Sequence, residues 1–159
     1  MPFRILVLGV GNTLLGDDGF GVAVVGALGP DALGDDGLSF IDGGTLGLAL
    51  LPDIEAADAV IVVDAGELGA APGALRVFEG DAVEAHLAGT RRNVHEVAVA
   101  DLFCAARLAE RLPRYRALVV AQPASTDWGL ELSPALAAAV TPARERIDEL
   151  IRRWRDESP

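Results

Sequence analysis

The sequence predicts an α/β fold. We expect a single three-layer domain with a mostly parallel, twisted sheet of about five strands, one of them an antiparallel edge strand, and helices on both faces. Short apolar runs rich in Val, Ile and Leu alternate with segments of helical periodicity, which is typical of successive β–α–β units. The two clearest runs, residues 5–8 and 59–63, are apolar throughout, which indicates strands buried on both faces.

Composition limits the class of protein. The chain has 159 residues and a formal net charge of −11, so we expect one domain over residues 1–159 that binds neither nucleic acid nor an anionic membrane. Cys104 is the only cysteine, which fits a reducing compartment. No signal peptide precedes the first apolar run, and that run is too short to cross a bilayer. These features predict a soluble, cytoplasmic protein.

The first half of the chain is expected to form three strands and two helices. The strands are predicted at residues 4–8, 38–41 and 59–63, and the helices at 20–28 and 48–56. Gly29 and Pro30 end the first helix. Pro52 is expected to break or shorten the second.

The second half is expected to add two strands and two helices. Residues 74–78 predict a weaker strand, which is expected to be antiparallel because its connection to the preceding strand is short. Residues 80–92 fit either a short helix or an ordered loop. A helix is predicted over 96–112, capped by Thr90 or Asn93 and stopped by Pro113, and then a strand at 117–120 and a loop at 122–132. Ser133 and Pro134 start the last helix, which runs towards Arg155 with Pro142 as its candidate kink.

Acidic side chains follow each of the first three predicted strands. Asp17 and Asp18 lie after the first strand, Asp42 after the second and Asp64 at the end of the third. Because ligands bind at the carboxyl ends of the strands in open α/β sheets, and the first and third strands are commonly neighbours, Asp18 and Asp64 are expected to flank one crevice. His95, near the start of a later helix, can add a nitrogen donor. Two carboxylates and an imidazole suit zinc, nickel or ferrous iron better than magnesium.

Other interpretations of these residues remain open. The dinucleotide fingerprint G-x-G-x-x-G is broken at Leu14, and two aspartates would repel a pyrophosphate. The paired aspartates can also be solvated acids in the first turn of a helix. Asp42 can simply orient its turn, and Asp64 and His95 can be capping residues. Outside this set, His86 is expected to be solvated and Cys104 to be a buried thiol.

Six segments of the sequence, taken in order, resemble the hydrogenase maturation endopeptidases. The most specific is residues 8–21, LGVGNTLLGDDGFG. The others are residues 42–47 (DGGTLG), 62–65 (VVDA), His95 with 100–102 (ADL), 122–123 (QP) and 129–134 (GLELSP). The resemblance covers nearly the whole chain. One departure is Glu96, which follows the histidine where relatives often have an uncharged residue.

The resemblance implies an endopeptidase that removes the C-terminal extension of a nickel–iron hydrogenase large-subunit precursor after nickel insertion. The residues of the family that bind the metal correspond here to Asp18, Asp64 and His95. The family holds no permanent cofactor, so the nickel is expected to arrive on the precursor, and the protein is expected to act as a monomer. The residues also fit a stand-alone metallohydrolase with its own ion, or a scaffold or nucleotide-binding module that uses the same crevice.

Overall fold

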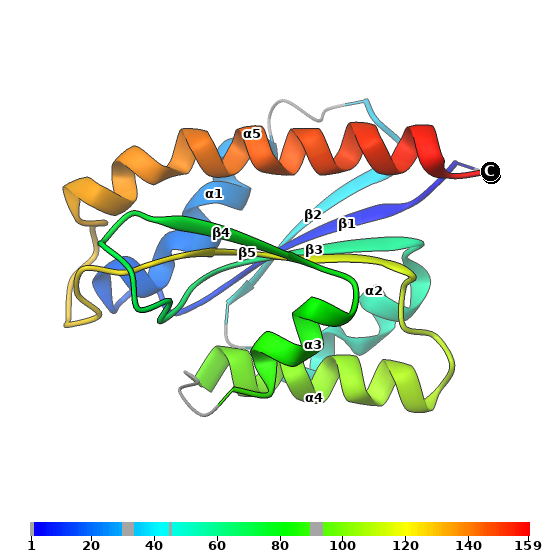
Figure 1. Cartoon of the computed structure of the whole chain (residues 1–159), viewed down its shortest axis with the longest axis horizontal. Coiled ribbons are helices and arrows are strands. Elements are labelled where there is room, and N and C mark those ends of the chain that lie inside the picture. The colour runs from blue at the N-terminus through cyan, green and yellow to red at the C-terminus, as the bar shows by residue number, and fades with distance from the viewer. Residues whose placement is uncertain (1, 30–33, 45, 90–93) are drawn as a thin grey trace.

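Five strands form one sheet in the order β2-β1-β3-β5-β4 (Figure 1). The computed structural model describes residues 2–29, 34–44, 46–89 and 94–159. The strands are β1 (Ile5–Val10), β2 (Leu38–Gly44), β3 (Ala59–Ala65), β4 (Leu75–Glu79) and β5 (Tyr115–Ala121). All pairs are parallel except β4 with β5, so the predicted antiparallel edge strand is confirmed.

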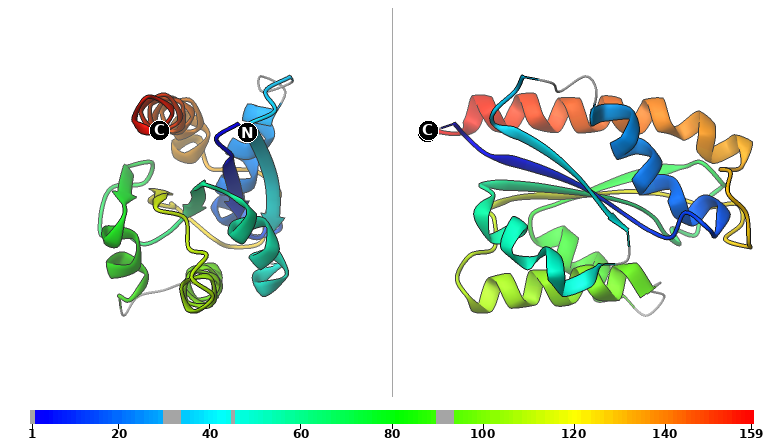
Figure 2. Two further views of the ribbon diagram at one scale, coloured as in Figure 1. Left: turned by 90° about the vertical axis from the view of Figure 1, so that its right-hand side faces the viewer. Right: turned by 180° about the vertical axis from the view of Figure 1, so that it is seen from behind.

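Helices cover both faces of this sheet, as expected for a three-layer α/β domain. The helical elements are η1 (Gly16–Gly19), α1 (Phe20–Leu28), η3 (Gly47–Leu50), α2 (Leu51–Ala56), α3 (Asp81–Leu87), α4 (Val94–Leu108) and α5 (Pro134–Glu157). Figure 1 and the two views of Figure 2 place α1 and α5 on one face and α2, α3 and α4 on the other. None of the helices in the described ranges is long and apolar enough to cross a membrane.

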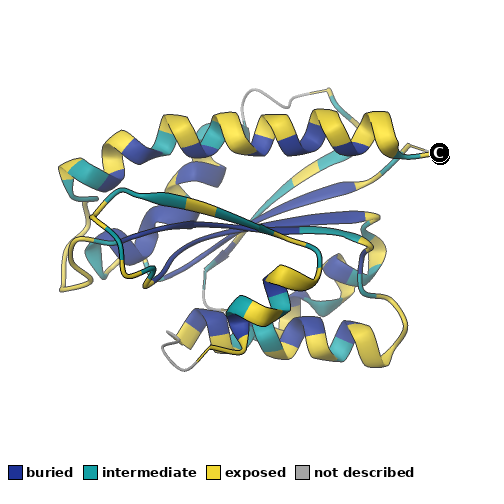
Figure 3. Cartoon of the chain, in the orientation of Figure 1, coloured by how far each residue is buried: buried dark blue, intermediate teal, exposed yellow. Residues whose placement is uncertain are grey.

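Side chains alternate between the two faces of the sheet along each strand, so the interior consists of two apolar cores, one on each face. On β3, Ile61 and Val63 pack with α1 and α5, whereas Val60 and Val62 pack with α2, α3 and α4. Successive side chains of a strand point to opposite faces, so Asp64 follows Val60 and Val62 towards the α4 side. Figure 3 shows the result: β1 and β3 are buried along almost their whole length, and each helix exposes only its outer side.

Several predicted boundaries were wrong for local reasons. The expected helix at 48–56 is a 3₁₀ turn followed by α2, and Pro52 lies in the first turn of α2, where a missing N–H costs nothing. In the segment 80–92, for which a short helix was one of two alternatives, residues 81–87 form helix α3, and residues 90–92 lie outside the described residues. Helix α4 starts at Val94 and ends at Leu108 rather than spanning 96–112, and its proposed caps Thr90 and Asn93 lie outside the described residues. Pro142 lies inside α5, as expected, and the helix extends on both sides of it.

Candidate functional site

Buried polar side chains gather at the carboxyl edge of the sheet. In the described part of the chain, the buried polar and charged residues are Asp17, Asp18, Asp64, His95, Glu96 and Gln122. All six lie at or just after the carboxyl ends of β1, β3 and β5, or at the start of α4, which begins at the same edge. Burying a charge is costly unless it is paired, so this concentration marks the edge as the candidate site.

Asp18 and His95 form the centre of this group. Nε2 of His95 lies 2.7 Å from Oδ2 of Asp18, although the two residues are 77 positions apart in sequence. The backbone N–H of Asn12 donates to the same oxygen at 2.9 Å. Burial raises the pKa of Asp18, but the hydrogen bond from His95, the one from Asn12 and the charge of His95 outweigh it and hold the pKa below its ordinary value. The carboxylate is therefore kept ionised, as a ligand or general base must be.

Glycine conformation brings Asp18 back towards the strand that precedes it. Gly11 has a φ of +133°, which L side chains rarely adopt, and a Cβ at this position would collide with the carbonyl oxygen of Asp18. The loop can therefore fold tightly over the end of β1 and continue into η1, which carries Asp18.

Asp64 also lies close to Gly11. Its Oδ1 is 3.8 Å from the position that a Cβ would take on Gly11, and it accepts the N–H of Ala65 at 2.8 Å. The strands β1 and β3 are neighbours, as expected, so the two aspartates flank the same loop. Among the residues that the structure describes, however, no three His, Cys, Asp or Glu side chains form a group able to hold a metal ion. Asp18 and His95 are in direct contact, at 2.7 Å.

This arrangement limits what the site can do by itself. One carboxylate and one imidazole are mixed oxygen and nitrogen donors of the kind that zinc, nickel and ferrous iron accept. Two donors leave most of a coordination shell to other groups.

Asp17 is not a solvated neighbour of Asp18, contrary to one sequence interpretation. Its side chain is buried and accepts hydrogen bonds from the backbone and hydroxyl of Ser133 (2.6 and 2.8 Å) and from the N–H groups of Ala124 and Ser125 (2.8 and 3.2 Å). Burial raises the pKa of Asp17, but these hydrogen bonds outweigh it and hold the pKa below its ordinary value. Asp17 thus fastens the loop before α5 to the turn that carries Asp18. No local sequence signal predicted this contact, because it joins segments more than 100 residues apart.

The remaining candidates divide between confirmed and corrected predictions. Asp42 is exposed and accepts a hydrogen bond from the N–H of Gly44 at 3.0 Å, which confirms the interpretation that it orients its turn.

His86 is not solvated, contrary to the prediction: its ring is mostly covered and stacks on Phe78 with ring centres 4.2 Å apart. Glu96 is buried next to it, with Oε1 3.7 Å from Nε2 of His86. Cys104 is exposed rather than buried, because it faces outward from α4.

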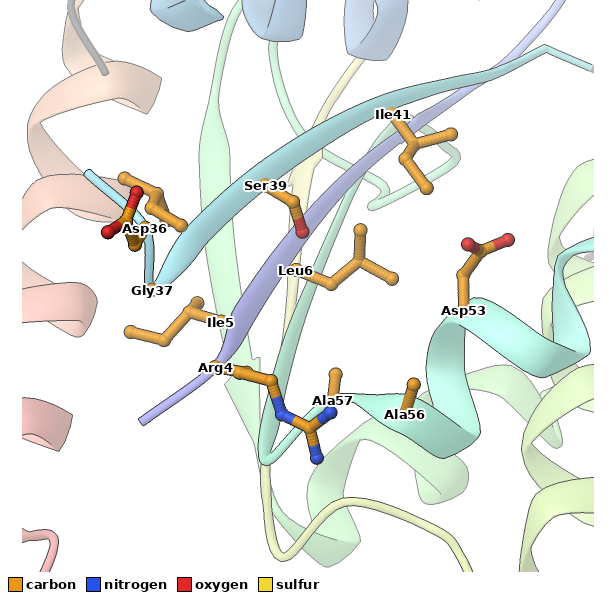
Figure 4. A pocket seen from close by; sticks show the side chains of 11 residues that line it. Arg4, Ile5, Leu6, Asp36, Gly37, Ser39, Ile41, Asp53, Ala56 and Ala57 are labelled. Carbon is orange, nitrogen blue, oxygen red and sulfur yellow. The ribbon is translucent and has the colours of Figure 1, made fainter. Parts of the chain in front are cut away.

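The larger cavities in the described part of the chain lie away from these residues, and one small cavity touches His95. One of about 240 Å³ lies beside the edge strand β2 and helix α2, lined by Arg4, Ser39 and Asp53 among others (Figure 4). Another, of about 510 Å³, lies between α3 and α4. A third, of only about 40 Å³, touches His95 and is otherwise lined by apolar residues and glycines of β1, β2, η3 and α4.

Comparison with known proteins agrees with the geometry. A family model described as "Hydrogenase maturation protease" matches residues 22–149. The Hydrogenase 2 maturation protease of Escherichia coli (strain K12) is 35% identical over 150 residues, which cover 94% of this chain and 91% of that protein. The hydrogenase expression/formation protein HupD of Bradyrhizobium diazoefficiens is 34% identical over 152 residues, covering 95% and 79%.

Solved structures give the same result. The hydrogenase maturating endopeptidase HybD from E. coli superposes with a TM-score of 0.87 at 34% identity, covering 94% of this chain and 93% of that one. The [NiFe] hydrogenase maturation protease HybD from Thermococcus kodakarensis gives a TM-score of 0.79 at 27% identity, covering 92% and 98%. By sequence and by fold, this chain belongs to the hydrogenase maturation protease family of endopeptidases.

Proposed function

We propose that this endopeptidase removes the C-terminal extension of a nickel–iron hydrogenase large-subunit precursor after nickel has been inserted. The observation that carries the proposal is the buried Asp18–His95 pair at the carboxyl edge of the sheet, 2.7 Å apart, in a member of this protease family. The names of the relatives, which are hydrogenase maturation proteases, support the substrate class.

Substrate-bound nickel is the proposed recognition element, with Asp18, Asp64 and His95 as the ligands that this chain contributes. Asp18 and His95 are already in contact. Asp64 lies at the end of the neighbouring strand, with its Oδ1 beside Gly11 of the loop that leads to Asp18. An ion that already has donors on the precursor needs only part of its shell from the protease. Cleavage would then depend on nickel loading, and no resident cofactor would be required.

Two routes to hydrolysis fit these residues. The substrate's ion can polarise the scissile carbonyl, or a water can be activated with a carboxylate as general base. In both routes Asp18 must be ionised, and its hydrogen bonds with His95 and Asn12 keep it so. The hydrogen bond also fixes the orientation of the imidazole before substrate arrives.

The test is trimming of purified precursor with and without nickel. We expect cleavage of the nickel-loaded form alone, and loss of at least about 1,000-fold in rate for Asp18→Ala and His95→Ala. Asp64→Ala should also abolish trimming. Asp53→Ala is a control that removes a carboxylate away from the Asp18–His95 pair, and it should cleave at the rate of the unaltered protein.

Three results would contradict the proposal. They are equal trimming of both precursor forms, trimming of neither, and full activity in all three site variants. Metal analysis after extensive dialysis addresses the alternative of a hydrolase with its own ion, since stoichiometric retained metal would favour that alternative.

A further inference from the structure

Exposed apolar side chains surround the candidate site. In the described part of the chain, eight large apolar side chains are exposed, and seven of them lie on segments at the carboxyl edge of the sheet; the eighth, Leu108, ends α4 at the opposite edge. We call these seven the apolar rim. Its loop side consists of Leu14, Trp128 and Leu130, and its helix side of Leu46, Leu48, Val94 and Val97. Single exposed apolar residues are normal on protein surfaces, but their concentration at one edge marks an interaction surface.

The loop side is the more prominent part of the rim. Trp128 is 83% exposed and Leu130 82%, and both belong to the exposed loop that joins β5 to α5 (Figure 3). Tryptophan is enriched at the centres of protein interfaces because it buries a large area with little loss of conformational freedom. Trp128 is therefore a strong candidate for contact with another polypeptide, and Leu130, two residues later and equally exposed, extends the apolar surface beside it.

Hydrogen bonds hold this loop in place. Gly16 donates to the carbonyl of Gly129 at 2.9 Å, and Gly129 donates to the carbonyl of Leu14 at 2.9 Å, so the loop pairs with the turn after β1. The buried carboxylate of Asp17 accepts four further hydrogen bonds from residues at the two ends of the loop. A surface ordered before binding loses less entropy when its partner arrives. The same turn carries Asp18, so the loop side of the rim is fixed relative to the candidate site.

We infer that the apolar rim is the docking surface for the polypeptide substrate, with Trp128 and Leu130 as its principal contacts. The inference rests on the proposed function, because an endopeptidase must hold a protein chain at its reactive residues and the rim is continuous with them. The exposed charges on the described 123–132 loop are the carboxylates of Asp127 and Glu131. The matching face of the substrate protein therefore carries apolar side chains with Arg or Lys beside them.

Steady-state cleavage of the nickel-loaded precursor tests the inference with a matched pair of variants. Leu130→Ser and Leu108→Ser each remove a leucine that is 82% exposed, one on the rim and one at the opposite edge. Leu130→Ser and Trp128→Ser should each raise KM about tenfold and leave kcat within about twofold. Leu108→Ser should change neither. Unchanged KM in both rim variants, or an equal increase in Leu108→Ser, would overturn the inference.

A binding measurement separates failure of the inference from failure of the proposed function. The chain has two tryptophans, exposed Trp128 and buried Trp154. In protein labelled with 5-fluorotryptophan, addition of the precursor should shift the fluorine resonance of Trp128 and leave that of Trp154 in place. A shift without cleavage would support the rim and contradict the proposed function. Cleavage without a shift of the Trp128 resonance would contradict the rim as docking surface and support the proposed function.

A second copy of the chain is the competing occupant. If the rim joined two copies, the Trp128 resonance would shift with protein concentration alone, and sedimentation would show a dimer that Leu130→Ser dissociates. That result would overturn the inference. We expect a monomer whose Trp128 resonance does not depend on concentration.

Discussion

The two edges of the sheet distribute polar and apolar groups in opposite ways. At the amino edge, exposed charges form ion pairs, such as Arg4 with Asp58 and Arg155 with Asp35. At the carboxyl edge, six polar side chains are buried, and the seven apolar side chains of the rim are exposed. Stability alone favours the first arrangement, because exposing apolar surface and burying charge both cost free energy. The carboxyl edge therefore has the composition expected of a surface that binds a partner.

The carboxyl edge is nevertheless well ordered. Asp17 and Asp18 each accept several hydrogen bonds, which lower the pKa of both carboxyls below the ordinary value despite burial. Such contacts compensate the cost of burying charge. The comparison predicts that single changes at the carboxyl edge cost much more than single changes at the amino edge.

The largest effect on stability is expected at Gly21, where α1 begins against the sheet. A Cβ here would collide with the carbonyl oxygen of Val63 and lie 2.7 Å from that of Val10, and both strands are central and cannot move aside. Gly21→Ala should lower the free energy of unfolding by about 3 kcal/mol or more. Gly26→Ala, on the same helix with open space around it, should raise it by up to about 1 kcal/mol through helix propensity. Urea unfolding of both variants measures the difference, and similar values for the two would contradict the packing argument.

The next effect is expected from Asp17→Ala. The change removes the acceptor of four hydrogen bonds and leaves the partly buried backbone N–H groups of Ala124 and Ser133 without this partner, so we expect a loss of about 2–3 kcal/mol in urea unfolding. Asp127→Ala, an exposed aspartate on the same loop, should change stability by less than about 0.5 kcal/mol. Limited proteolysis should cut the loop before α5 faster in Asp17→Ala alone. A loss below about 1 kcal/mol would show that Asp17 does not fasten the loop.

A smaller effect is expected at the amino edge. Arg155 donates to both carboxylate oxygens of Asp35, at 2.9 and 2.8 Å, but about a third of each side chain is exposed. Arg155→Ala should therefore cost only about 0.5 kcal/mol, and the difference should vanish in about 1 M NaCl. Thermal unfolding at low and high salt measures it. A cost equal to that of Asp17→Ala would remove the contrast between the edges.

The smallest effect is a pH dependence at His86, behind the candidate site. Burial lowers the pKa of His86, and the charge of Arg76 on β4 lowers it further; Phe78 and Glu96 also face the ring. As pH falls through about 6.5, the unfolded chain takes up a proton before the folded protein does. The stability that the neutral His86 contributes is therefore present above that pH. It is lost as the pH falls towards the pKa that His86 has in the folded protein. His86→Phe should lose less melting temperature between about pH 7.5 and pH 5.5 than the unaltered protein. An equal loss in both would assign the dependence to other groups.

Most of the fold could be predicted from sequence because its determinants are local. The apolar runs of β1 and β3 specify strands buried on both faces, and the short connection between β3 and β4 specifies an antiparallel edge. Ser133 and Pro134 predicted the start of α5 correctly, since capping depends on neighbouring residues. The error at α2, and the open choice between helix and loop at α3, arose where short apolar segments lack a clear period.

The candidate site could be predicted only in part. The strand-end positions of Asp18 and Asp64 follow from topology, and His95 from its place at the start of α4. The sequence could not show that Asp18 and His95 touch while Asp64 hydrogen-bonds the N–H of the next residue, because side-chain direction is set by packing between distant segments. For the same reason, the sequence could not predict that Asp17 fastens the loop before α5 or that Trp128 and Leu130 are exposed.

The sequence alone therefore determined the class of fold, the family and the set of residues from which a site can be built, since these depend on pattern and order along the chain. The tertiary structure decided which of those residues meet and which face solvent. Hydrogen bonds across 77 residues, as between Asp18 and His95, and across more than 100, as between Asp17 and Ser133, exist only after the strands have paired. The same is true of the apolar rim, which forms when loops from separate strands are brought to one edge of the sheet.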